Sequence, residues 1–564
     1  MKKDILALAA LGFVLFMLFA QLIPIIDGDT AFYATIAKNM IKSGDFITLK
    51  FVNTGDIIDK PPLAMWFMAV SFKLFGINEF ALSLWHSLLA IGTVILTYLM
   101  GRELFGRRGG LLAGLILMLS CQFFYITRTP MLDIPLTFFI TASFYCIFRL
   151  NGTKYCATTT SPIYYYIFSI ALALALLTKG PVGIAIPLGA LIILKFLTLT
   201  TFDKTHNSQP IHTNLFHLFM STLLFLTIAA PWFIIEYKIL GQPFANLFFL
   251  RNFLRFFRPT DIIGNLNTIA PQYDFYSYFL QIFLLFAPWG GFVYPAIFYG
   301  FKNKNQRLFL VWAAIAIGIF AFSLNYKIGR YILPAFPALA IIVTNLLENI
   351  MEEGEKLKKY ILTSAWLNTV LLIPLFSIVT IYLFISFPKE IQAFKPIALP
   401  FLVVFSSGLI AGTIFLFKKE VEKSIITFVT ASTLSYIIFI IMAGLFINKA
   451  MPTKILMQAM NEIGSEHKED KIIAIVYKGE EPRQEYFYIQ DSLFDKHANM
   501  DGPLYYIADR EELVSTFKTN LRKKNPDILV GISKEQEIKK IKQIKIIKEI
   551  NGYILFLSRN SYSP

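Results

Sequence analysis

The stretch that decides the fold is the run from residue 5 to residue 26, ILALAALGFVLFMLFAQLIPII, which contains no charged side chain. A helix needs about 20 consecutive apolar residues to cross the hydrocarbon core of a bilayer, and this run has enough. It follows the short basic start Met1-Lys2-Lys3-Asp4 and so resembles a secretory signal, but no small-residue cleavage site comes after it. The sequence therefore predicts an uncleaved first membrane-spanning helix.

Composition extends this prediction to the whole chain. Of the 564 residues, 56% are hydrophobic and only 16% are charged, against about 25% charged in soluble domains. The formal net charge of +15 fits basic loops on the cytoplasmic side and attraction to anionic lipid. No basic stripe with interleaved aromatics lies outside the apolar segments, so nucleic-acid binding is not expected. The three cysteines form no CxxC pair and indicate neither a disulfide framework nor a zinc site.

Apolar stretches recur along the chain with short polar breaks, and we expect thirteen of them to span the membrane. They lie near 5–26, 79–100, 110–127, 133–149, 163–178, 181–200, 214–236, 275–299, 308–324, 331–349, 361–386, 397–416 and 425–446. With a cytoplasmic N-terminus, the basic loops around Arg102, Arg149, Lys304, Lys358 and Lys419 all fall on the cytoplasmic side. The long loops 27–78 and 237–274 then lie on the outer face, with everything after residue 446.

From about residue 447 the composition changes to that of a small mixed domain. Strands are expected over 471–477, 504–507, 528–532 and 552–557, interleaved with charged helical runs over 510–524 and 535–542. Alternation of strands with helices is typical of an α/β domain. We therefore divide the chain into a transmembrane domain, 1–446, and an outer α/β domain, 447–564.

Ionisable side chains gather on the predicted outer face. The first outer loop also contains two segments with helical apolar spacing, 30–41 and 63–75, which predict helices lying in the membrane interface. Cations hold a phosphate and neutralise the charge on a leaving group, and a carboxylate accepts a proton from an incoming hydroxyl. A phosphate-linked donor needs both. The residues concerned are Asp27, Asp29, Asp45, Asp56, Asp59, Lys60, Arg128, Asp133, Lys179, Arg251, Arg255, Arg258, Lys327, Arg330 and Tyr331.

Six short motifs occur in order over about the first 340 residues. They are DGDTAFYA at 27–34, SGDF at 43–46, DKPPL at 59–63, MLDIPL at 131–136, LTKG at 177–180 and KIGRYILP at 327–334. This ordered set resembles the aminoarabinose (4-amino-4-deoxy-L-arabinose) lipid A transferases and their protein O-mannosyltransferase relatives, which are polytopic GT-C glycosyltransferases. The thirteen spans and the outer α/β tail are similar to the aminoarabinose transferase architecture over the full length.

The resemblance implies an inverting enzyme of the bacterial inner membrane. It would move one aminoarabinose-like sugar from undecaprenyl phosphate to lipid A, or to a related lipid or glycan, on the periplasmic face. Such a reaction modifies lipopolysaccharide and confers polymyxin resistance, and it uses no nucleotide cofactor. A protein O-mannosyltransferase-like enzyme with a Ser or Thr acceptor is the first alternative, and a multi-helix lipid or solute transporter is the second. The ionisable residues cluster at one face and the two halves show no repeat, which favours an enzyme over a transporter.

The resemblance also implies roles for individual residues. Asp29 matches the acidic residue central to catalysis, and we expect Asp27 and Asp133 to be further catalytic carboxylates. Lys60 and Arg255 match ligands of the donor phosphate, with Lys179 and Tyr331 close to them. We expect three further outer cations to help bind this phosphate; these are Arg128, Lys327 and Arg330.

The family's metal site is incomplete in this sequence. Asp59 stands where the family often has a Glu that helps to hold a divalent ion. A second acid of the family is replaced by Thr30, an arginine by Phe32, and a histidine by Gln272 or Tyr273. Asp59 is therefore the one expected metal ligand, with Asp27 as a substitute for the lost carboxylate.

The nature of the acceptor sets the expected role of Asp29. A lipid A phosphate is already ionised near neutral pH, so Asp29 would orient the acceptor or stabilise positive charge on the sugar. A serine, threonine or sugar hydroxyl must lose a proton, and Asp29 would then act as its general base. Both alternatives remain open from the sequence.

Overall fold

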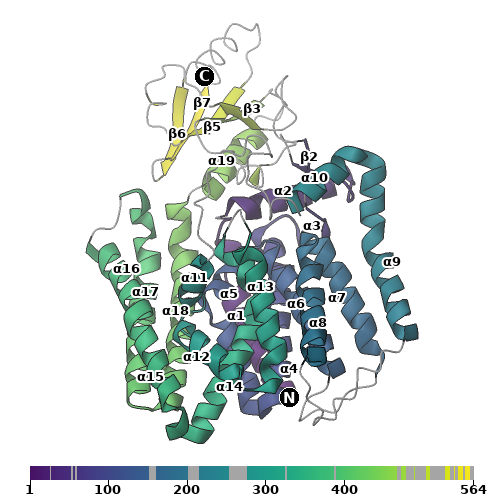
Figure 1. Cartoon of the computed structure of the whole chain (residues 1–564). Coiled ribbons are helices and arrows are strands. Elements are labelled where there is room, and N and C mark those ends of the chain that lie inside the picture. Colours follow the sequence, from purple (N-terminus) through teal and green to yellow (C-terminus); the bar gives the residue numbers. More distant parts are fainter. Residues whose placement is uncertain are drawn as a thin grey trace.

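The computed structural model describes residues 1–25, 27–51, 55–57, 60–151, 161–200, 215–252, 276–323, 327–385, 389–451, 453–466, 472–477, 488–489, 504–507, 528–533, 539, 544–550 and 553–558. In these residues a body of long helices carries a small β-sheet at one end (Figure 1). Short helices lie between the sheet and the helical body. The chain is therefore a polytopic helical protein, as the sequence predicted, and it carries a small β-sheet after the last long helix.

Within the described residues, eight helices are long and apolar enough to cross a bilayer, and the bent pair α11–α12 adds a ninth. These eight are α1 (Lys2–Met17) with η1 (Ala20–Leu22), α4 (Glu79–Met118), α6 (Asp133–Asn151), α9 (Leu215–Leu240), η5 (Gly329–Ala335) with α14 (Phe336–Glu353), α15 (Lys358–Leu367) with α16 (Ile373–Ile385), α17 (Lys395–Phe417) and α18 (Val421–Ala450). Shorter helices cover the other predicted spans; they are α7 (Ile163–Lys179), α8 (Val182–Thr200) and α13 (Arg307–Ala321). The number thirteen stays a prediction.

The forty residues of α4 form a hairpin rather than one straight helix. Gly106, with φ of 76°, breaks the helical geometry and separates the two predicted spans. The two halves pack so closely that a Cβ on Gly110 would lie 2.9 Å from the carbonyl oxygen of Tyr98. A Cβ on Gly101 would lie 2.9 Å from the Cβ of Ala113. Small residues at a helix contact let backbones approach, as is usual in membrane bundles.

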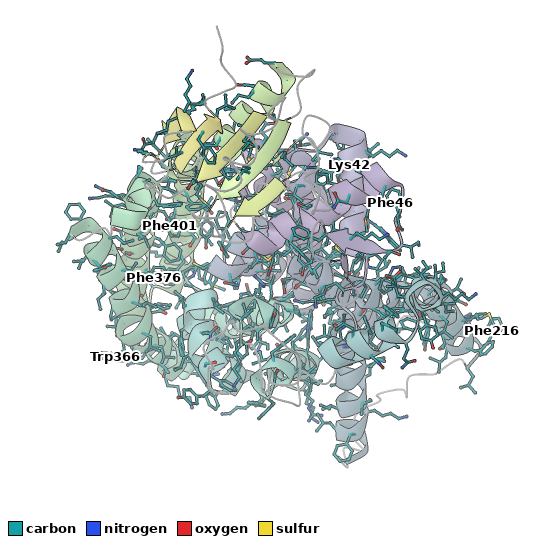
Figure 2. The ribbon with its side chains drawn as sticks, turned by 90° about the horizontal axis from the view of Figure 1, so that it is seen from above. Lys42, Phe46, Phe216, Trp366, Phe376 and Phe401 are labelled. Atoms are coloured by element: carbon teal, nitrogen blue, oxygen red, sulfur yellow. The ribbon has the colours of Figure 1, made fainter. Side chains whose placement is uncertain are left out.

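The centre of the bundle is α14, whose residues from Phe336 to Leu347 are all buried. Around it, Trp312 of α13 stacks on Phe144 of α6 with ring centroids 4.1 Å apart. Large apolar side chains on α15 and α16 point outward instead, and Trp366 lies at the rim of the body (Figure 2). Such an apolar exterior fits a lipid environment, because the hydrocarbon core of a bilayer accommodates apolar side chains.

The remaining short elements lie at the ends of the bundle or within its bends. They are α2 (Gly28–Ser43), β1 (Leu49–Phe51), β2 (Gly55–Ile57), α3 (Leu63–Phe75), α5 (Cys121–Thr127), α10 (Gln242–Asn252), α11 (Ser277–Leu285), α12 (Gly290–Gly300), η4 (Lys304–Gln306), η6 (Gly354–Leu357), η7 (Asn368–Leu372), η8 (Lys389–Phe394) and α19 (Thr453–Glu466). The first outer loop thus holds two helices, α2 and α3, where the sequence predicted interfacial helices.

The C-terminal unit is a five-stranded sheet in the order β4-β3-β5-β7-β6. Its strands are β3 (Ile472–Tyr477), β4 (Leu504–Ile507), β5 (Ile528–Ser533), β6 (Ile544–Ile550) and β7 (Tyr553–Ser558). β3 is parallel to β4 and β5, and β7 is antiparallel to β5 and β6. The sequence predicted four of these strands and missed β6. The helices expected over 510–524 and 535–542 fall on residues that, except for 539, lie outside the described ones.

One hydrophobic cluster joins the sheet to the first outer loop. It contains Met457 and Met460 of α19, Met65 and Met68 of α3, and Leu555 of the sheet. α19 is therefore packed between the interfacial helices and the sheet (Figure 1). α18 ends at Ala450, and the predicted domain boundary after residue 446 stays a prediction.

Candidate active site

The first site element is the start of α2, which the carboxylate of Asp27 caps. Its Oδ1 accepts hydrogen bonds from the backbone N–H of Asp29 at 2.8 Å and of Thr30 at 3.1 Å. Asp, Asn, Ser and Thr are favoured at this position because they satisfy the unpaired N–H groups of the first turn. Asp27, which we expected among the catalytic acids, thus holds Asp29 in the first turn of the helix.

The second element is the turn between α5 and α6, which a buried histidine holds. His86 contacts the carbonyl of Thr127 through Nδ1 at 3.0 Å and accepts the N–H of Met131 at Nε2 at 3.2 Å. These two contacts use both ring nitrogens of a neutral imidazole. The turn is thereby fixed so that Asp133 begins α6 with its side chain directed at the neighbouring helices.

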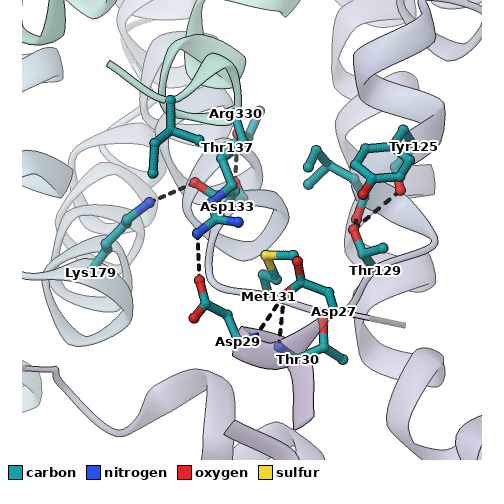
Figure 3. Close-up of polar contacts among 12 residues, drawn as sticks. Asp27, Asp29, Thr30, Tyr125, Thr129, Met131, Asp133, Thr137, Lys179 and Arg330 are labelled. Atoms are coloured by element: carbon teal, nitrogen blue, oxygen red, sulfur yellow. Dashed lines mark hydrogen bonds and ion pairs between the residues drawn. The ribbon is translucent and has the colours of Figure 1, made fainter. Parts of the chain in front are cut away.

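Asp29, Asp133, Lys179 and Arg330 form one ion-pair cluster (Figure 3). Nζ of Lys179 lies 2.6 Å from Oδ1 of Asp133. The guanidinium of Arg330 joins both carboxylates, with Nη2 2.5 Å from Oδ2 of Asp29 and Nε 3.7 Å from Oδ2 of Asp133. Two acids and two cations balance in charge, which suits a partly buried site where an unpaired charge is costly.

Exposure differs sharply within this cluster. The side chain of Asp133 is 4% exposed and that of Lys179 is 9% exposed, whereas Asp29 is 38% exposed. Asp133 is therefore the buried anchor of the cluster, and Asp29 is the carboxylate that an external molecule reaches. Arg330, 18% exposed, connects the two.

Tyr331 completes the cluster from the adjacent position in η5. Nζ of Lys179 lies 4.5 Å from its ring centroid, and the Arg330 guanidinium lies 6.0 Å from it. Cations are attracted to an aromatic face at such distances. η5 itself is held where it begins, because the Tyr278 hydroxyl donates to the carbonyl of Ile328 at 3.1 Å.

The other predicted phosphate ligands have different outcomes. Arg128 does not join the ion-pair cluster: its guanidinium donates to the carbonyls of Leu15 and Leu18 at 3.0 and 3.1 Å, at the end of α1. Lys60 and Lys327 are both half-buried, and their role as phosphate ligands stays a prediction. Arg255 lies outside the described residues.

The expected metal site also stays a prediction. Asp59 lies outside the described residues, and among those described no three His, Cys, Asp or Glu side chains come together to hold an ion. Two other carboxylates of the same loop have partners of their own, since Asp27 caps α2 and Asp29 pairs with Arg330. As described, these two carboxylates belong to no group of potential metal ligands.

A cavity of about 370 Å³ opens beside the start of α2. Aromatic and aliphatic side chains from α1, α5, α16, α17 and α18 line most of it, among them Phe16, Phe124, Phe376, Phe401, Tyr436 and Phe439. Its polar wall contains Asp27, Thr30 and Arg128, so the cavity reaches the turn that carries Asp29. An apolar chain and a polar headgroup would each find a matching surface here.

The cavity also contains residues that were not predicted as site residues, among them Tyr125 and Glu79. Tyr125 lines the cavity together with Asp27, and its phenolic hydroxyl can donate a hydrogen bond. Glu79 is 6% exposed at the first position of α4. An acid at the boundary of an apolar span is a signal that the sequence offered, because charges there are usually paired or functional.

Comparison with known proteins places these features in context. The family model described as dolichyl-phosphate-mannose-protein mannosyltransferase matches residues 26–240. An uncharacterized protein of Aquifex aeolicus is 30% identical over 356 residues, which are 61% of this chain and 73% of that protein. The undecaprenyl phosphate-alpha-4-amino-4-deoxy-L-arabinose arabinosyl transferase of Aeromonas salmonicida is 26% identical over 61% of this chain and 60% of its own length. The chain thus spans about 60% of the length of several curated relatives it matches.

A solved structure matches over nearly the whole chain. The crystal structure of ArnT from Cupriavidus metallidurans bound to undecaprenyl phosphate superposes with a TM-score of 0.73, covering 99% of each chain at 18% identity. At this identity the likeness concerns the fold.

Proposed function

Because the chain belongs to the ArnT-like family of polytopic GT-C glycosyltransferases, we propose that it transfers a single sugar from a polyprenyl phosphate to an acceptor at the membrane surface. The observation that carries the proposal is the ion-pair cluster of Asp29, Asp133, Lys179 and Arg330 beside an apolar cavity. A polyprenyl phosphate combines a long apolar chain with an anionic head. The site offers lipid-compatible walls for the chain and two cations for the head.

The reaction would proceed by a single displacement. The bond between the anomeric carbon and the donor phosphate oxygen breaks as the acceptor oxygen forms its bond from the opposite face. The bonding electron pair leaves with the phosphate, which departs as polyprenyl phosphate. Lys179 and Arg330 stabilise the negative charge that grows on this leaving group, and such stabilisation contributes most when the donors are fixed beforehand. The two carboxylates fix both cations.

Asp29 is the group placed to act on the acceptor, because it is the most exposed carboxylate of the cluster. When the donor phosphate attracts Arg330, the contact of Arg330 with Asp29 weakens and the carboxylate can turn towards the acceptor. For a hydroxyl acceptor, Asp29 then takes the proton as the new bond forms. For an ionised phosphate acceptor no proton is transferred, and Asp29 orients the acceptor or stabilises positive charge on the sugar ring.

The finer assignment we propose is an aminoarabinose-like sugar, carried on undecaprenyl phosphate and transferred to lipid A or a related lipid. It is supported by the printed activity of the Aeromonas relatives and by the undecaprenyl phosphate in the structurally similar ArnT. It is also supported by the cavity beside Asp27, which suits a lipid better than a peptide. The distribution of basic loops supports a site on the periplasmic face of the inner membrane.

Replacement of Asp29 by Asn tests the proposal. In proteoliposomes with labelled undecaprenyl-phosphate sugar, the wild type should transfer sugar to lipid A, and Asp29→Asn should lower kcat by at least about a thousandfold while remaining folded. The matched control is Asp45→Asn, because Asp45 belongs to the same outer loop but pairs with Lys50 at 3.5 Å. Transfer to a serine- or threonine-containing peptide instead of lipid A would support the mannosyltransferase-like alternative. Normal turnover by Asp29→Asn would overturn the mechanism.

A further inference from the structure

A buried carboxylate connects the C-terminal unit to the approach of the active site. Glu79 is 6% exposed and starts α4, whose first turn is capped by Asn78. Nζ of Lys454, at the start of α19, lies 2.6 Å from Oε1 of Glu79. The hydroxyl of Tyr488 donates to the same oxygen at 2.9 Å. Two residues that follow the last membrane helix thus bind one acid at the outer end of the second span.

The same two residues also hold the segment that leads to Asp27. The Tyr488 hydroxyl accepts the backbone N–H of Ile25 at 2.9 Å. Nζ of Lys454 donates to the carbonyl of Gln21 at 3.0 Å. Burial, with the charge of Glu79 adding to it, raises the pKa of Tyr488, so the phenol stays protonated and makes both contacts at once. Segment 21–25 is therefore bound to Lys454 and Tyr488 through its own backbone groups.

α2 is held by the same region. Nζ of the buried Lys38 donates to the carbonyl of Ile489 at 2.7 Å, next to Tyr488. Tyr488 is fixed in turn, because the Asn461 side chain of α19 donates to its carbonyl at 3.0 Å. The elements before and after Asp27 and Asp29 are thus bound to one short part of the C-terminal unit.

We propose that Glu79, Lys454 and Tyr488, here called the latch, position the Asp27–Asp29 turn for catalysis. This rests on the proposed function in so far as Asp29 acts on the acceptor. The geometry favours positioning over a purely stabilising role. A buried ion pair contributes little net stability compared with apolar packing, yet it fixes one arrangement of its surroundings. Ile25, Asp27 and Glu79 also line the same cavity, so the latch shapes its polar mouth.

The proposal predicts specific results for Tyr488→Phe, a substitution that removes one hydroxyl and keeps the ring. The N–H of Ile25 loses its partner, and a hydrogen bond of this kind contributes about 1 kcal/mol. Hydrogen exchange at residues 20–30 should therefore speed up about fivefold or more, while exchange in α14 stays unchanged. For transfer, kcat should fall about tenfold, with KM for the donor within twofold. Glu79→Gln keeps an acceptor oxygen but loses its charge, so it should show a smaller effect of the same kind.

Two controls separate positioning from general loss of structure. Tyr382→Phe removes a hydroxyl from an exposed tyrosine of α16 and should change neither exchange nor kcat. Lys539→Met removes a lysine of the C-terminal unit that pairs with Glu549 at 2.6 Å, away from the latch. It should leave exchange at residues 20–30 as in the wild type.

Hydrogen exchange and sugar transfer test different parts of the proposal. If Tyr488→Phe and Glu79→Gln show wild-type exchange at residues 20–30, the latch does not hold the turn and the inference is wrong. If exchange rises but kcat is unchanged, the latch is structural only and its positioning role is wrong. If the wild type itself transfers no sugar, the proposed function fails, whereas the exchange measurement still decides whether the latch exists.

Discussion

The sharpest prediction concerns Arg330→Met, because Arg330 joins the two carboxylates of the cluster. Its contact with Asp29 is made to a side chain that is 38% exposed, so water replaces the lost partner. Exposed ion pairs contribute only about 0.2–1 kcal/mol to stability. Asp133 keeps Lys179 at 2.6 Å. We therefore expect Arg330→Met to lower the free energy of unfolding by about 1 kcal/mol.

Lys179→Met should cause a much larger loss of stability than Arg330→Met. It leaves Asp133, which is only 4% exposed, without the partner closest to it. Breaking a buried pair from one side costs about 3–5 kcal/mol, because a buried charge loses its compensation. The stability loss from Lys179→Met should therefore exceed that from Arg330→Met severalfold. The loss of a fixed cation at the leaving phosphate should lower kcat about 10²–10³-fold in Arg330→Met.

Both quantities can be measured on the same preparation. Transfer from labelled undecaprenyl-phosphate sugar gives kcat, and the temperature at which the monodisperse peak is lost on size exclusion reports stability. Arg108→Met is the matched control, because Arg108 forms an ion pair with Glu422 and both of these side chains are exposed to solvent. It should change neither quantity. Arg330→Met with kcat within threefold of the wild type, or with a stability loss as large as that of Lys179→Met, would refute the reasoning.

Three further changes test the fold and the cavity. Asp27→Ala should lower stability by about 0.5–2 kcal/mol through loss of the α2 cap, and Asp27→Ser should restore it in thermal unfolding. Gly110→Ala should destabilise the α4 hairpin by about 1–3 kcal/mol, because its Cβ would lie 2.9 Å from the carbonyl oxygen of Tyr98, whereas Gly318→Ala, with open space around it, should not. Ala443→Trp partly fills the 370 Å³ cavity and should raise KM for the lipid substrate about tenfold at unchanged kcat, whereas Ile441→Trp on the exposed side of α18 should leave KM alone.

Several site residues could be predicted because topology places them on one face. Asp29, Asp133, Lys179, Arg330 and Tyr331 all lie at ends of apolar segments that the predicted topology assigns to the outer face. The structure brings all five together. Which cation pairs with which acid could not be predicted, since pairing depends on the rotation of each helix about its axis.

Other features were beyond the reach of sequence patterns for definite physical reasons. Arg128 looked like its neighbours in the motif, but its guanidinium meets carbonyls at the end of α1, a contact across 110 residues. The contact of Tyr488 with Glu79 joins residues 409 positions apart. β6 was missed because its lysines interrupt the apolar pattern, although exposed lysines are typical of an edge strand.

The measurement that tests the central claim most directly is a product balance. Purified protein in liposomes is given undecaprenyl-phosphate sugar labelled in the sugar, together with lipid A, and both lipid products are quantified by mass spectrometry. Sugar transfer predicts one undecaprenyl phosphate released for each glycosylated acceptor formed, and neither product with Asp29→Asn. Recovery of the intact labelled donor on the opposite leaflet, with no free undecaprenyl phosphate and no glycosylated acceptor, would show transport instead and contradict the account.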